Sequence, residues 1–90
     1  MKPSDSVISP DGTLKVTLME FDPSRGEGRL RIEELRREHA RYYVTVTYGE
    51  AGQMRIDYKT YDVYKASEFP FSTGRNDLVR SIEIVQVPSD

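Results

Sequence analysis

The chain has 90 residues and a net charge of −2, with 37% hydrophobic and 31% charged residues, the balance of a folded globular domain. It contains no Cys, which excludes disulfides, thiolate metal sites and Cys nucleophiles, and its charge gives no general attraction to nucleic-acid phosphates. No apolar run approaches the ~20 residues of a membrane-spanning helix. We therefore expect one cytoplasmic domain over residues 1–90, with residues 1–6 flexible.

The N-terminal third predicts a turn between two strands. Ser9-Pro10-Asp11-Gly12 has Pro at its second position and Gly at its fourth, which is typical of a type I turn. A short strand at Val7-Ile8 is expected to pair back across this turn with a strand over 14–21, whose apolar residues alternate with polar ones. Residues 22–28 lack a phosphate-binding glycine pattern, which favours a surface loop.

Residues 29–41 are compatible with two structures. Four residues fall on one face of a helix at spacings of three and four: Ile32, Leu35, His39 and Tyr42. Glu33 and Arg37 add an opposite-charge pair four residues apart, worth a few tenths of a kcal/mol. These features favour a helix from about 30 to 41. The alternative is a strand over 29–34 followed by a turn, which would make the protein all-β.

A β-hairpin is predicted in the middle of the chain. Apolar and polar residues alternate over 42–48 and again over 54–60, around the short turn of residues 49–52, which Gly bounds at both ends. Both apolar sets lie on one face only if Val46 pairs with Met54 or with Ile56. The sequence leaves these two registers open.

The C-terminal third predicts a loop, a short helix and a strand. Residues 68–71 have a loop composition, and their two Phe are expected to cap the core. Ser72 or Thr73 is placed to cap a short helical turn through 77–79. The strand over 81–87 has apolar residues on both faces, so it is expected to be central or covered on two sides.

These elements predict an α+β domain, a small four-stranded antiparallel sheet with one principal helix, in the order strand, helix, strand, strand, short helix, strand. That order resembles a ferredoxin-like arrangement. The alternative is an all-β meander or sandwich. The residues expected in the core are Leu14, Val16, Leu18, Leu35, Val44, Val46, Met54, Ile56, Ile82 and Ile84.

The sequence offers no set of catalytic or metal-binding residues. His39 is the only His, and with no Cys in the chain it has no second soft ligand beside it. On a helical face with Ile32 and Leu35 it is expected to be a half-buried packing residue. The Glu residues near it alternate with Arg, which favours a solvated charged surface. We predict no enzymatic activity, no catalytic residues, no cofactor and no metal.

Two surfaces are candidates for binding. The outward face of the hairpin combines Tyr with Arg and Lys, which suits either stacking on single-stranded nucleic acid or anchoring of a protein partner. The second candidate is the Arg-rich segment over 25–41, whose interspersed Glu residues favour a protein over a phosphate backbone. The residues predicted to bind a partner are Tyr43, Arg55, Lys59, Tyr61, Arg29, Arg36 and Arg37.

The functional prediction is a small non-catalytic protein that binds another macromolecule, most simply a protein partner, as inhibitors, immunity factors and adaptors do. One alternative is a single-stranded nucleic-acid-binding domain that uses the Tyr/Arg sheet face. Another is a structural subunit that forms a homo-oligomer through an exposed sheet edge. No membrane association is predicted.

Overall fold

The computed structural model describes residues 2–37, 39–60, 65–74 and 77–88. Within these ranges the chain forms seven β-strands and no helix, and hence no helix that could cross a membrane. The strands are β1 (Ser6–Ile8), β2 (Leu14–Asp22), β3 (Glu27–Glu34), β4 (Arg41–Tyr48), β5 (Gly52–Lys59), β6 (Ala66–Ser72) and β7 (Val79–Val87).

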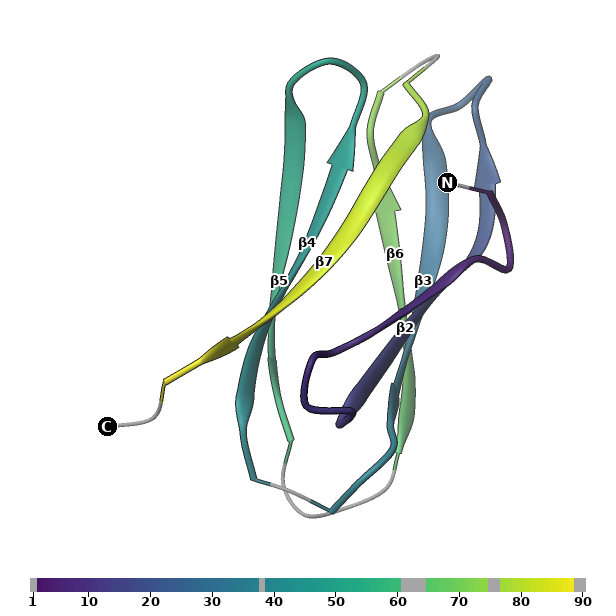
Figure 1. Ribbon diagram of the computed structural model, residues 1–90. Helices are drawn as coiled ribbons and strands as arrows, with labels where there is room; N and C mark the ends of the chain where they lie inside the picture. The colour runs from purple at the N-terminus through teal and green to yellow at the C-terminus, as the bar shows by residue number, and fades with distance from the viewer. Residues whose placement is uncertain (1, 38, 61–64, 75–76, 89–90) are drawn as a thin grey trace.

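The strands form two antiparallel sheets that pack face to face (Figure 1). Sheet A has the order β1-β2-β3-β6, and sheet B has the order β5-β4-β7. The chain makes hairpins from β2 to β3 and from β4 to β5, and it changes sheet after β3, after β5 and after β6. The predicted α+β fold, with a principal helix and a ferredoxin-like order, is therefore wrong, and the architecture is an all-β sandwich.

The predicted helix over 30–41 is wrong because its first half belongs to β3. Leu30 lies between Leu18 of β2 and Phe69 of β6, and both Leu30 and Ile32 are fully buried. Burying such a side chain contributes about 1.5–3 kcal/mol, which exceeds the few tenths of a kcal/mol from helical charge pairs. Leu35, which the helix would have buried, follows β3 and is 39% exposed.

Three expectations for the C-terminal third are also wrong. Residues 68–71 lie within β6, an edge strand of sheet A, where Pro70 is tolerated because an edge needs fewer N–H donors. The short helix does not form over described residues 77–79, because β7 already begins at Val79. β7 is an edge strand of sheet B, and Val85 on its outer face is 53% exposed.

The core lies between the two sheets and confirms most of the predicted set. Buried as expected are Leu14, Val16, Leu18, Val44, Val46, Ile82 and Ile84. Met54 and Ile56 are only half-buried because they lie on β5, an edge of sheet B. The structure adds Leu30, Ile32, Tyr42, Tyr58, Phe71 and Val79 to the buried core.

The two predicted turns have the expected positions. The Gly12 N–H donates to the Ser9 carbonyl at 2.9 Å, and Val7 on β1 pairs with Val16 on β2, as the turn over 9–12 predicts. In the hairpin, Val46 pairs with Met54, one of the two registers that keep the apolar sets on one face.

Val46 gives a direct test of this register. Its side chain is fully buried, so Val46→Ala removes two methyl groups from the core and leaves a cavity. We expect a loss of about 1–3 kcal/mol in the free energy of unfolding, measured by urea titration. An unchanged urea midpoint would contradict the burial of this residue. Thr45→Ala, on the outer face of the same strand, is the control and should have little effect.

Candidate functional site

The outer face of sheet B places an aromatic ring among charged and apolar side chains. Side chains alternate along each strand, so the residues between the buried ones point away from sheet A. Tyr43 on β4 lies between Asp57 of β5 and Val85 of β7. We use the name Tyr43 patch for the set Arg41, Tyr43, Arg55, Asp57 and Val85.

The ring of Tyr43 is held by two guanidinium groups. The central carbon of Arg55 lies 4.2 Å from the ring centroid, and that of Arg41 lies 5.5 Å from it, both within the range of a cation–π contact. Arg41 also donates from Nε and Nη2 to the two carboxylate oxygens of Asp57, at 2.8 and 2.5 Å. This bidentate ion pair fixes the orientation of Arg41, and the two guanidinium groups in turn restrict the Tyr43 ring. A partner that binds this ring would therefore restrict little further side-chain motion.

The ion pair also fixes the charge of the patch. Hydrogen bonds from Arg41 lower the pKa of the Asp57 carboxyl below its ordinary value, and the positive charges of Arg41, Lys59 and Arg55 lower it further. The same contact raises the pKa of Arg41. Both groups are therefore ionised throughout the physiological pH range.

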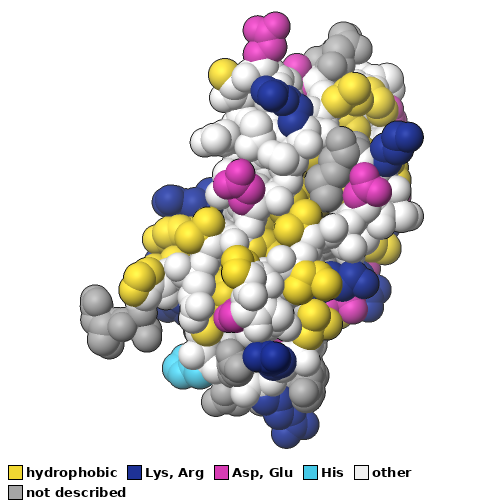
Figure 2. Space-filling model, viewed as in Figure 1, with side chains coloured by type: hydrophobic (Ala, Val, Ile, Leu, Met, Phe, Trp, Pro, Cys, Tyr) yellow, Lys and Arg dark blue, Asp and Glu magenta, His cyan; other side chains and the backbone are white. Residues whose placement is uncertain are grey.

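An exposed apolar side chain completes the patch. Val85 is 53% exposed beside Tyr43, and Ile8 on β1 is 55% exposed. Figure 2, in the view of Figure 1, shows hydrophobic side chains in several groups on the surface, with Lys, Arg, Asp and Glu side chains scattered among them. In the patch itself, Val85 and Tyr43 lie beside Arg41, Arg55 and Asp57, and such a mixture of apolar, aromatic and charged groups is found at protein interfaces.

The outer face of sheet A differs because its charges are already paired. Arg29 contacts Glu68 at 3.0 Å and Glu20 at 3.6 Å, and Arg31 contacts Glu33 at 3.6 Å. These pairs are partly solvent-exposed, so each contributes little to stability. They nevertheless engage Arg29 and Arg31, the two Arg that β3 contributes to this face.

The predicted binding residues do not form one site. Tyr43, Arg55 and Lys59 lie together on the outer face of sheet B. Arg29 lies on the outer face of sheet A, and Arg36 and Arg37 are exposed in the connection from β3 to β4. Tyr61 lies outside the described residues.

Three members of the patch were missed by sequence reasoning. Arg41, Asp57 and Val85 become neighbours of Tyr43 only in the observed pairing of β4 with β5 and β7. With Val46 opposite Ile56 instead of Met54, Lys59 would have faced Tyr43. An apolar residue on the outer face could have been predicted for the last strand, because its sequence has apolar residues on both faces.

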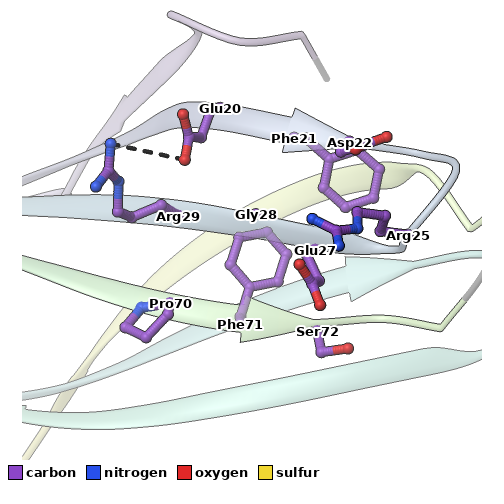
Figure 3. Close-up of a pocket in the computed structure, with 10 residues that line it drawn as sticks. All are labelled: Glu20, Phe21, Asp22, Arg25, Glu27, Gly28, Arg29, Pro70, Phe71 and Ser72. Atoms are coloured by element: carbon purple, nitrogen blue, oxygen red, sulfur yellow. Dashed lines mark ion pairs between the residues drawn. The ribbon is translucent and has the colours of Figure 1, made fainter.

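A shallow groove of about 820 Å³ lies at the end of sheet A, beside the turn from β2 to β3 (Figure 3). The rings of Phe21 and Phe71 stack with centroids 6.0 Å apart, across Gly28. A Cβ on Gly28 would lie 2.7 Å from Cζ of Phe71 and 2.9 Å from the carbonyl oxygen of Glu20, so a larger residue there would displace the Phe71 ring or the β2 backbone. The groove mixes two Arg with three acidic residues, and this balance indicates no particular ligand charge.

Between the sheets, a buried carboxylate meets a buried phenol. Glu34, at the end of β3, is 6% exposed, and the Tyr58 hydroxyl donates to its Oε2 at 3.1 Å. Within the described residues, Glu34 Oε1 has no hydrogen-bond partner. Burial, and then the negative charge of Glu34, raise the pKa of Tyr58 to about 12. The pair therefore holds the phenol in its neutral, donating form.

The raised pKa of Tyr58 predicts an alkaline transition. The folded state binds the phenol proton of Tyr58 more tightly than the unfolded chain does, and this difference contributes to the free energy of unfolding. The contribution is complete below pH 10 and is lost as the pH rises from about 10 to about 12. We expect the urea midpoint to fall over this range, and to fall less steeply in Tyr58→Phe. Parallel curves for the two proteins would contradict the assignment.

The described residues contain no group of three or more His, Cys, Asp or Glu side chains arranged to hold a metal ion. His39 is exposed, which corrects the expectation of a half-buried packing residue. The patch on sheet B is thus the arrangement with the clearest recognition chemistry on the described surface. Comparison with protein-family models, curated proteins and solved structures gave no match to this chain.

Proposed function

We propose that this protein is a non-catalytic, cytoplasmic binding protein that docks on another protein through the Tyr43 patch, in the manner of an inhibitor, immunity factor or adaptor. The observation that carries this proposal is the ring of Tyr43, held by Arg41 and Arg55 beside the exposed Val85. Tyr and Arg are enriched among the residues that dominate binding energy at protein interfaces. A ring fixed before binding loses little conformational entropy when a partner covers it.

The same geometry argues against a nucleic-acid partner. A base stacks on an open ring face, but Arg55 already lies 4.2 Å from the ring centroid of Tyr43. Asp57 and Glu83 lie on the same outer face, and their carboxylates would repel a phosphate backbone. Single-stranded nucleic acid is therefore the less favoured partner, and the experiment includes it as a separate arm.

The proposal predicts that partner binding depends on Tyr43. Proteins captured by the wild-type chain from the source cell would be identified, purified and titrated against variants by calorimetry. We expect Tyr43→Ala to weaken binding about thirtyfold or more, because it removes the central aromatic anchor. Arg31→Ala, on the outer face of sheet A, is the matched control and should bind as wild type. Equal affinities for wild type and Tyr43→Ala would refute the patch as the docking site.

The second arm uses a fluorescent single-stranded oligonucleotide. We expect no saturable change in anisotropy at about 150 mM salt, the physiological ionic strength. Saturable binding that weakens steeply with salt and is lost in Tyr43→Ala would favour the nucleic-acid function instead.

A further inference from the structure

Of the four sheet edges, β5 is the one best suited to pair with another strand. β1 at one edge of sheet A has only three residues, and β6 at the other edge contains Pro70, which lacks an N–H donor. β7 at one edge of sheet B has β1 next to part of it. β5 has eight residues without Pro, and in the described part of the chain only β4 pairs with it. A free edge of this length is a template for another strand.

The outer face of β5 carries charges of alternating sign. Arg55, Asp57 and Lys59 are exposed and occupy alternate positions, with the neutral Gln53 before them. Charged edge strands usually prevent pairing, because like charges would meet across the new ladder. An alternating pattern is different, since one antiparallel register can bring unlike charges together.

One antiparallel register that aligns nearly all of β5 makes the strand complementary to a second copy of itself. With Ile56 opposite the second copy's Ile56, each Arg55 faces an Asp57, and each Lys59 faces a Gln53. On the inner face, each half-buried Met54 then faces a Tyr58. All apolar residues stay on the inner face, as sheet continuity requires.

The neighbouring registers that keep the faces aligned are repulsive. A shift in one direction places Arg55 opposite the second copy's Arg55. A shift in the other direction places Asp57 opposite Asp57, and Arg55 opposite Lys59. Like charges directly opposite one another destabilise an antiparallel pair. The register with Tyr58 opposite Tyr58 also pairs Asp57 with Lys59, but it overlaps only the last three residues of β5. Among the registers that align most of the strand, the charge pattern therefore favours the one centred on Ile56.

We propose that two copies of this chain dimerise through β5 in this register, so that two copies of sheet B form one continuous six-stranded sheet. Pairing would cover Met54 and Ile56, the half-buried apolar residues at the edge of the core. Asp57 can accept from Arg41 of its own chain and from the second copy's Arg55, because a carboxylate has about four acceptor sites. The inference concerns the edge of sheet B and does not depend on the proposed function of its face.

The first test reverses the charges one at a time. By light scattering, we expect the wild type to approach twice the chain mass of 10.4 kDa as concentration rises. Arg55→Asp and Asp57→Arg each place two like-charge pairs in the dimer, and we expect each to raise the dissociation constant about tenfold or more. An equimolar mixture of the two variants restores both Arg–Asp contacts, so it should dimerise where each variant alone is monomeric. Thermal melts confirm that each variant is folded.

The second test reads the register directly. The chain has no Cys, so a single introduced Cys crosslinks only to its own position in the second copy. We expect Ile56→Cys to form a disulfide dimer under mild oxidation much faster than Arg55→Cys or Asp57→Cys. A wild type that stays monomeric at all concentrations, a mixture that stays monomeric, or faster crosslinking at 55 or 57 would each overturn the proposal.

Discussion

Replacing Gly26 by Ala should destabilise the protein severely. Gly26 is buried with φ of +66°, and a Cβ there would lie 1.6 Å from the carbonyl oxygen of Gly74. The obstacle is backbone, so no side-chain rotation relieves it. The Gly26 carbonyl also accepts from the Thr73 N–H at 2.6 Å and from Thr73 Oγ1 at 3.2 Å. These contacts join the turn after β2 to the connection before β7, and the substitution would separate them.

We expect Gly26→Ala to lower the free energy of unfolding by about 3–5 kcal/mol, the sum of backbone strain and overpacking. Gly12→Ala is the matched control. Gly12 has a similar φ of +77°, but the nearest atom to its Cβ position is Arg36 Nη2 at 3.9 Å. Only the conformational penalty applies there, about 1 kcal/mol. Equal losses in the two variants, measured by urea titration, would show that the close approach to Gly74 contributes nothing.

Sequence reasoning succeeded where alternation was uninterrupted. From Leu14 to Leu18 in β2 and from Tyr42 to Val46 in β4, every second residue is apolar and buried in the structure. The hairpin from β4 to β5 was limited to two registers, because any odd shift would expose the apolar set. Local rules also located the turn over 9–12, since its Pro and Gly positions specify the turn type.

Sequence reasoning failed at β3 because a carboxylate occupies an inward position. Leu30 and Ile32 alternate as in a strand, but the next inward residue is Glu34, which made the segment read as a charged helix. Its burial depends on the hydroxyl of Tyr58, 24 residues later in the chain. No local propensity contains that information, and tertiary pairing overrides the helix preference.

The second failure, at β6, came from Pro70. Ser67, Phe69 and Phe71 alternate toward the interior, but Pro beside two Phe was interpreted as a loop. Pro is compatible with an edge strand, and whether a strand lies at an edge depends on sheet order rather than on local sequence. The composition of the Tyr43 patch likewise depends on strand pairing, which local sequence does not specify. Alternation placed Tyr43, Arg55 and Asp57 on one face, while the positions of Asp57 and Val85 directly beside Tyr43 required the observed strand pairing.

Removing the ring of Tyr42 should be nearly as damaging as the change at Gly26. Tyr42 is fully buried, and its hydroxyl donates to Asp11 Oδ2 at 2.5 Å. Asp11 Oδ1 accepts from Ser9 Oγ at 2.7 Å and from the Thr13 N–H at 3.0 Å, so this tyrosine joins the core to the turn that precedes β2. We expect Tyr42→Ala to lower the free energy of unfolding by about 3–5 kcal/mol, measured by urea titration.

The matched variant Tyr42→Phe keeps the ring and removes only the hydrogen bond, and we expect a loss of about 1 kcal/mol at neutral pH. Burial opposes ionisation of Asp11, but hydrogen bonds from Tyr42, Ser9 and Thr13 outweigh it and lower the pKa of Asp11 below 3.8. The ionised Asp11 carboxylate therefore stabilises the folded state fully at pH values above its pKa in the unfolded chain. This stabilisation is lost as the pH falls through the lower pKa that Asp11 has in the folded state. At acidic pH, the free energy of unfolding of Tyr42→Phe should therefore fall less steeply with decreasing pH than that of the wild type. Identical slopes for the two proteins would contradict the assignment of this hydrogen bond as a source of stability.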